Sequence, residues 1–309
     1  MNRTSRACEL TNSVKKNSFM SNKYLFSFSL ALFLIAGVFL STGCADDASE
    51  TPSFIKIDTV IVDSTDFDRY GSIRHKINFA FVYIDDNLQG AYQLPAKFPV
   101  IGEGPKKITI YAGVAEFGNG SVITRYMFYN SYTVNDTLVL MDTLVLNPHV
   151  QYDTLTTVVF NVQDFDTHPG DFILSSGSSG DYQASFDDID PAAEGLCAYM
   201  HMSADTAGTI CTIESATAIT VPKGAVGYFL EIDYKCNAPF FFDIKTSTGY
   251  RSIIGFNTKN TWNKAYINIT YAMDVTPGTD VKLIFKMNRD ITILDQEVLI
   301  DNIKLIYLP

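Results

Sequence analysis

Short runs of alternating apolar and polar residues, bounded by Gly, Pro, Asn and Asp, recur from about residue 54 to the end of the chain. No window of a dozen residues shows the 3.6-residue apolar period of an amphipathic helix. Successive side chains of a β-strand point to opposite faces, so this alternation is typical of strands with one buried face. The sequence therefore predicts an all-β protein.

The predicted strands fall into two blocks, 54–152 and 153–309. In the first block we expect strands at 55–62, 76–84, 88–94, 106–112, 123–129 and 137–146. In the second we expect them at 197–202, 218–221, 228–235, 240–245, 252–256, 264–269, 281–287 and 298–307. Many short strands at this spacing favour two-sheet sandwiches, so we predict two β-sandwich domains.

The segment before the first block differs in composition. Lys23 precedes an apolar run at 24–40, and Ser41-Thr42-Gly43 then leads to Cys44. A short positive flank, an apolar stretch and small residues before a cut site indicate a secretory signal peptide, here 20–43. As a membrane-spanning helix the run would be at the short limit. Residues 1–19 are too polar for such a signal, so we expect them to be untranslated or disordered and translation to start at Met20.

Residues 40–44, LSTGC, resemble the lipobox of bacterial lipoproteins, with Ser41 where that pattern usually has leucine. The resemblance implies that the chain is cut before Cys44 and that this cysteine carries a diacylglycerol (palmitate-type) anchor. Asp46 and Asp47 lie in an acidic stretch similar to the export signal of Bacteroidota surface lipoproteins. A flexible, solvated tether over 44–53 would have the same composition. The resemblance implies an outer-membrane lipoprotein exposed at the cell surface.

Charge restricts the partners of this chain. From Cys44 onward it has 18 basic and 33 acidic residues, a net charge of −15, because five basic residues and one acidic residue precede that position. Phosphate binding requires clustered Lys and Arg, so nucleic acid is excluded as a partner. Peripheral attachment to anionic lipid is also disfavoured, which leaves acylation to supply the anchor.

Both blocks resemble known modules. The segment 81–91, followed by Pro95, Pro99 and the strand 104–110, resembles PEGA-type small surface β-sandwiches, which carry no catalytic group. In the second block, 164–166 (DFD), 261–269 (TWNKAYINI) and 299–305 (LIDNIKL) resemble galactose-binding-like jelly rolls attached to glycan-active proteins. The resemblance implies a carbohydrate-binding-like jelly roll over 153–309.

Signals of catalysis are weak. The four histidines are scattered, and neither a Gly-x-Ser-x-Gly elbow nor a His-Glu-x-x-His motif occurs. The carboxylate pairs Asp187/Asp188 and Asp164/Asp166 could serve a glycosidase, which needs two carboxyl groups about 5 to 10 Å apart. In loops of so acidic a chain such pairs are usually solvated. We therefore expect no enzyme, with a glycan hydrolase as the remote alternative.

Three aromatic residues of the second block are candidates for ligand binding. The faces of Trp262, Tyr228 and Tyr250 could stack on the C–H faces of sugar rings. The alternative for each is a place in the core or at one end of the sandwich.

A structural calcium ion is a further candidate. Asp301 is in phase with Leu299 and Ile303, so on a regular strand it would face the interior, where a lone charge is costly. Its partner would be either backbone amides at a bulge or a cation shared with Asp164 or Asp166.

Three cysteines remain after Cys8 and Cys44. Cys197 and Cys211 lie in strand-like surroundings and could form a hairpin disulfide in an oxidising compartment, which would leave Cys236 over. No Cys/His spacing indicates zinc.

Two functional hypotheses follow. The first is a non-enzymatic surface lipoprotein whose second sandwich binds carbohydrate. The second is a structural or assembly lipoprotein, in which one sandwich docks a partner protein of an outer-membrane complex.

Overall fold

The computed structural model describes residues 51–63, 70–117, 122–167, 169–275 and 279–309. The predicted signal peptide, the lipidation site Cys44, and Asp46 and Asp47 lie outside these residues. Thr51–Pro309 forms one compact unit.

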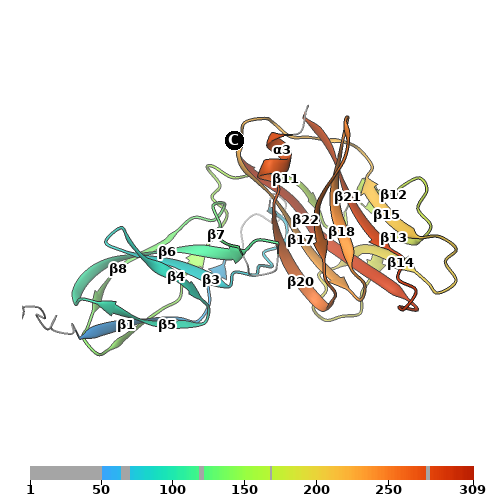
Figure 1. The fold of residues 1–309 in the computed structure, drawn as a ribbon. Coiled ribbons are helices and arrows are strands. Elements are labelled where there is room, and N and C mark those ends of the chain that lie inside the picture. The colour runs from blue at the N-terminus through green and yellow to red at the C-terminus, as the bar shows by residue number, and fades with distance from the viewer. Residues whose placement is uncertain (1–50, 64–69, 118–121, 168, 276–278) are drawn as a thin grey trace, which may run out of the picture. The chain divides into compact units, whose positions relative to one another are not determined.

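The all-β prediction is confirmed. The described strands form five sheets, accompanied by the short helix α3 (Thr270–Asp274) and the 3-10 turn η1 (Pro169–Asp171). Figure 1 shows the strands and α3. Within the described ranges no helix has the length and apolar character needed to span a bilayer.

The strands up to residue 150 make three sheets, ordered β5-β1-β9, β4-β3-β6-β7 with β8 also paired to β6, and β10-β2. These strands are β1 (Pro52–Ile57), β2 (Ile61–Val62), β3 (Phe79–Ile84), β4 (Asn87–Gln93), β5 (Ala96–Ile101), β6 (Gly104–Ala115), β7 (Ile123–Arg125), β8 (Tyr132–Leu138), β9 (Thr143–Leu146) and β10 (His149–Val150). Alternate side chains of β1 and β6, including Ile55, Ile57, Ile108 and Ile110, are fully buried in one shared cluster. The strand period of two therefore builds an N-terminal sandwich core.

The later strands make two six-stranded sheets, which we call the β22 sheet and the β21 sheet. The β22 sheet has the order β13-β14-β22-β17-β20 with β11 on β22, and the β21 sheet has the order β12-β15-β21-β18-β19 with β16 on β21. The strands are β11 (Val158–Gln163), β12 (Phe172–Leu174), β13 (Asp181–Asp187), β14 (Leu196–Met202), β15 (Ile210–Ser215), β16 (Ile219–Thr220), β17 (Val226–Cys236), β18 (Phe240–Thr246), β19 (Gly249–Phe256), β20 (Lys259–Asn268), β21 (Asp280–Asn288) and β22 (Gln296–Leu308).

The chain of this region passes repeatedly between the two sheets, as in a jelly roll. The steps from β14 to β15, from β17 to β18 and from β20 through β21 to β22 each change sheet. Inward side chains such as Leu230, Ile232, Phe242 and Phe285 form one large buried cluster between them. The prediction of sandwich-like sheets is confirmed, while the predicted domain boundary at 152–153 stays a prediction.

Part of the other face of the β22 sheet is also buried. Phe229, Tyr266 and Ile306 belong to a second cluster together with Tyr126 and Phe128 of the N-terminal block. The Tyr126 ring lies 4.9 Å from the Tyr266 ring and 5.7 Å from the Phe229 ring, both edge-on, which is a favourable aromatic arrangement. Polar residues that lie beside this cluster, such as Glu231 and Lys304, are therefore shielded from water.

Candidate functional site

The β21 sheet has one face toward the core and one face open. Because Phe242 and Phe285 point inward, their strand neighbours point outward. The cross-strand register aligns Glu214 with Ile284 and Asp243, and Lys282 with Lys245 and Tyr250. The set that we call the open face consists of Thr212, Glu214, Phe241, Asp243, Lys245, Tyr250, Lys282, Ile284 and Lys286.

A carboxylate held by two lysines lies in the middle of the open face. Glu214 lies 2.9 Å from Lys282 Nζ and 3.4 Å from Lys245 Nζ, and Ser175 donates to it at 3.3 Å. Burial opposes the charge of Glu214, but the hydrogen bond and charge of Lys282 lower its pKa below the ordinary value. Glu214 is therefore an anchored hydrogen-bond acceptor.

A second ion pair lies beside it. Lys286 Nζ is 3.3 Å from the Asp243 carboxylate, whose side chain is only 7% exposed, and 5.4 Å from the centre of the Phe241 ring. The lysine thus links an aromatic ring to a carboxylate. Salt bridges of this kind add little stability, but they fix the positions of donors and acceptors.

Tyr250 borders a groove on this face. The groove has a volume of about 290 Å³ and is lined by the 175–178 loop, Asp243, Lys286 and Tyr250. The Tyr250 side chain is 66% exposed, with Lys245 Nζ 5.4 Å from its ring centre. A second groove of about 420 Å³ reaches Lys245, Lys282 and Asp280. An exposed ring beside preorganised donors and acceptors can bind a polyhydroxylated ligand.

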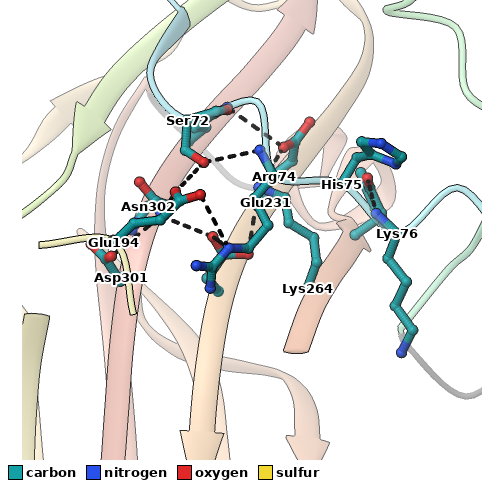
Figure 2. Close-up of polar contacts among 12 residues, drawn as sticks. Ser72, Arg74, His75, Lys76, Glu194, Glu231, Lys264, Asp301 and Asn302 are labelled. Atoms are coloured by element: carbon teal, nitrogen blue, oxygen red, sulfur yellow. Dashed lines mark hydrogen bonds and ion pairs between the residues drawn. The ribbon is translucent and has the colours of Figure 1, made fainter. Parts of the chain in front are cut away.

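The outward residues of the β22 sheet form a different feature, a buried charge cluster (Figure 2). Glu231 accepts hydrogen bonds from Tyr126 and from Tyr152 (3.0 Å) and pairs with Lys264 Nζ at 3.0 Å. Lys264 Nζ is also 3.7 Å from Asp233. All of these charged groups are inaccessible to water.

The cluster extends toward the surface. Asn302 donates to Asp233 at 2.9 Å and to Glu194 at 3.2 Å. Arg74 Nε is 3.4 Å from Glu194, and Ser72 donates to the same carboxylate. The segment containing Ser72 and Arg74 is thus tied to the β22 sheet through Glu194 and Asn302.

Burial and charge act in opposite directions within the cluster. Burial opposes the charge of Lys264, but Asp233 and Glu231 raise its pKa above the ordinary value. Burial and the charge of Lys264 lower the pKa of Lys304, whose ammonium lies under the Tyr152 ring, to about 8. Because these side chains are closed to water, the buried part of the cluster does not offer a surface to a ligand.

Asp301 shows where the predicted strand phase was wrong. The pairing of β17 with β22 is irregular between Glu231 and Asp233, and Asn302 has a φ of 50° there. This bulge shifts the phase, so that Asp301 lies opposite Asp233 and away from the sandwich core. Asp301 is still 1% exposed, and its carboxylate accepts the Asn302 amide at 2.7 Å. A backbone amide at the bulge is therefore one partner of Asp301, and the shared calcium ion stays a prediction.

The three carboxylates proposed for calcium have other partners. Asp164 accepts hydrogen bonds from the amide and hydroxyl of Thr167, and Asp166 accepts the Leu196 amide at 3.0 Å. Asp166 nevertheless lies near enough to Asp301 for its charge to raise the pKa of that acid. Across the described ranges no three His, Cys, Asp or Glu side chains are placed to hold a metal ion.

The three predicted ligand-binding aromatics do not come together. Tyr250 lies on the open face. Tyr228 is buried, and its hydroxyl donates to the Pro222 carbonyl, so its predicted ligand role is wrong. Trp262 is half-buried on the β22 sheet, where its Nε1 donates to Asp188 at 2.9 Å and Arg74 lies 5.8 Å from its ring centre.

The structure does not contain the predicted disulfide. Cys197 and Cys211 are free and buried, because β14 and β15 belong to opposite sheets and do not form a hairpin. Their thiols donate to the carbonyls of Phe186 and Asp181. Burial raises the pKa of Cys197 to about 12 and that of Cys211 to about 11.

Apart from Tyr250, no residue of the open face stands out in the sequence as a candidate for ligand binding. Glu214, Asp243, Lys282 and Lys286 alternate with apolar residues, which marks the outward face of a strand. Only cross-strand register shows that β15, β18 and β21 bring them together.

No protein-family model and no curated protein matches the chain. A solved structure described as a carbohydrate-binding module of the β-sandwich superfamily is 15% identical, with a TM-score of 0.36, over 83% of this chain and 99% of its own. A family 29 carbohydrate-binding module is 11% identical, with a TM-score of 0.32, over 49% and 91%. TmCBM61, solved with β-1,4-galactotriose, is 13% identical, with a TM-score of 0.31, over 46% and 97%. At such TM-scores these likenesses leave the function to be argued from the site.

Proposed function

We propose that this protein is a membrane-anchored, surface-exposed lipoprotein without enzymatic activity, and that the open face of its C-terminal sandwich binds carbohydrate. The lipobox-like sequence before Cys44 supports the anchor. Asp46 and Asp47 support the surface location.

The observation that carries the carbohydrate proposal is the exposed Tyr250 ring beside the Glu214, Lys245 and Lys282 cluster. A sugar ring presents C–H groups that can lie on an aromatic face and hydroxyls that donate and accept hydrogen bonds. Charged partners hold the polar side chains in place before the ligand arrives, which lowers the entropy lost on binding.

The chemistry of the open face favours binding over hydrolysis. A glycosidase needs one carboxyl group that stays protonated near neutral pH to act as the general acid. The two lysines instead favour the ionised form of Glu214, whose pKa is lowered. Asp243 is likewise paired with a lysine.

A glycan array probed with the full chain tests this proposal. We expect selective binding to a group of related glycans, and titration calorimetry should then show roughly tenfold weaker affinity for Tyr250→Ala. The matched control is Tyr271→Ala on α3, because that tyrosine is 76% exposed and lies off the open face. Uniformly flat array binding, or equal effects of the two substitutions, would contradict carbohydrate binding here and favour partner docking.

A further inference from the structure

An exposed apolar turn joins β8 to β9. The Asp142 amide donates to the Val139 carbonyl at 3.1 Å, which closes a turn with Leu140 and Met141 at its centre. The exposed fractions of Val139, Leu140 and Met141 are 54%, 40% and 71%. Three successive apolar side chains at a turn gain nothing from exposure to water.

The backbone of this turn is also unfavourable for its residues. Met141 has a φ of 64°, a conformation that turns usually assign to Gly, Asn or Asp. Neither turn chemistry nor core packing explains a methionine at this position. An exposed apolar residue with an unfavourable backbone conformation and no stabilising contact within the fold indicates a contact with another molecule.

The turn lies where the described chain begins (Figure 1). The Met141 amide donates to the Pro52 carbonyl at 3.0 Å, and the Phe54 amide donates to the Asp142 carbonyl at 2.9 Å. Ile101, which is 63% exposed, is paired with Pro52 across β1 and β5. The group that we call the apolar tip consists of Ile101, Val139, Leu140 and Met141.

The adjoining face of the β5-β1-β9 sheet also carries exposed apolar side chains. Val145 on β9 is 52% exposed, and Lys97 Nζ lies 5.0 Å from the centre of the Phe54 ring. Lys56 is paired with Lys97 across the strands and contacts Asp58 at 2.8 Å. Apolar side chains bordered by lysines, whose stems can cover apolar surface, suit the boundary between lipid and water.

Chain length limits how far the apolar tip can be from the lipid anchor. Only seven peptide units separate Cys44 from Thr51, and a fully extended chain spans at most about 3.5 Å per residue, or on the order of 25 Å here. Acylation of Cys44 would therefore hold the Pro52 end of β1 close to the bilayer. We propose that the apolar tip inserts into the interfacial layer of the membrane that holds the anchor, an inference that rests on the anchoring part of the proposed function.

Tryptophan quenching by brominated lipids tests the contact in the full, lipidated chain. Wild-type protein in vesicles that contain brominated phosphatidylcholine gives the baseline from Trp262, the single native tryptophan. Met141→Trp should add tryptophan emission to this baseline. We expect the added emission to be at least twofold lower in brominated vesicles than in vesicles without bromine. The control Ile291→Trp changes an 87% exposed apolar residue between β21 and β22 and should show no added quenching.

Vesicle flotation and mass analysis of the acylated cysteine separate the two possible failures. Protein that does not float with the vesicles contradicts the anchor and the inference together. Protein that floats while Met141→Trp is quenched no more than Ile291→Trp contradicts the inference alone. Protection of the introduced indole from both bromolipid and aqueous acrylamide would show that protein covers the tip, which also overturns the inference.

Discussion

Asp301 provides a direct test of the buried charge cluster. Its carboxyl group is 1% exposed, and burial, together with the charges of Asp233 and Asp166, raises its pKa from 3.8 to about 8. Asp301→Asn removes the acid but keeps a side-chain oxygen that can accept the Asn302 amide. The substitution therefore removes the cost of ionising this site, together with the 3.2 Å bond that Asn302 Nδ2 donates to the second carboxyl oxygen.

The sign and size of the change in unfolding free energy follow from proton linkage. Between about pH 4 and pH 8 the native carboxyl group holds a proton that the unfolded chain releases, so wild-type stability falls as pH rises through that window. The slope limit is about 1.4 kcal/mol per pH unit, which gives an upper bound of about 4 kcal/mol at pH 7. We expect Asp301→Asn to be more stable than wild type by roughly 2–4 kcal/mol at pH 7 and by less at pH 5.

Urea unfolding at pH 5, 7 and 9 measures this difference. Asp187→Asn is the matched control, because Asp187 is an exposed carboxylate on β13 and its loss should change stability by less than about 0.5 kcal/mol. A stability difference between Asp301→Asn and wild type that stays constant from pH 5 to pH 9 would refute the reasoning, as would a variant less stable than wild type at pH 9.

Two further predictions concern buried groups. Glu231→Gln removes the charge that pairs with Lys264 at 3.0 Å and should lower the free energy of unfolding in urea by about 3 kcal/mol, whereas a loss below about 1 kcal/mol would show that Asp233 alone suffices. Cys197, Cys211 and Cys236 should resist iodoacetamide in the native protein, because they are buried and their pKa values are raised to about 11 or 12. All three should be alkylated in urea without a reducing agent, and mass spectrometry that found fewer than three modified thiols would indicate a disulfide.

Several strands were predicted correctly from the residue pattern, and others were not. The prediction of a strand at 240–245 agrees with β18, and that at 281–287 lies within β21, because both are short apolar runs, rich in aromatic or β-branched residues and partly alternating with polar ones. The strands β5, β10, β11, β12, β13 and β15 were not predicted. β13 has only one large apolar residue, Phe186, beside its tyrosine, so its alternation is weak.

The burial of the charged residues on β17 could not be predicted from the sequence. Glu231 and Asp233 alternate with Leu230 and Ile232, a pattern that normally marks a solvated strand face. In the structure both carboxylates are fully buried, because tyrosines from the N-terminal block cover that face. Local alternation indicates which side chains share a face of the strand, but it does not indicate what packs against that face.

The sequence by itself determined the all-β class, the sandwich-like architecture and the need of Asp301 for a partner, because each depends on side-chain period or on the cost of one buried charge. Tertiary structure alone decided that Glu214, Asp243 and Tyr250 share an open face, that Tyr228 is core, and that Cys197 and Cys211 lie on opposite sheets. These outcomes depend on which strands pair and in what register, and pairing between distant segments leaves no trace in the local pattern of either strand.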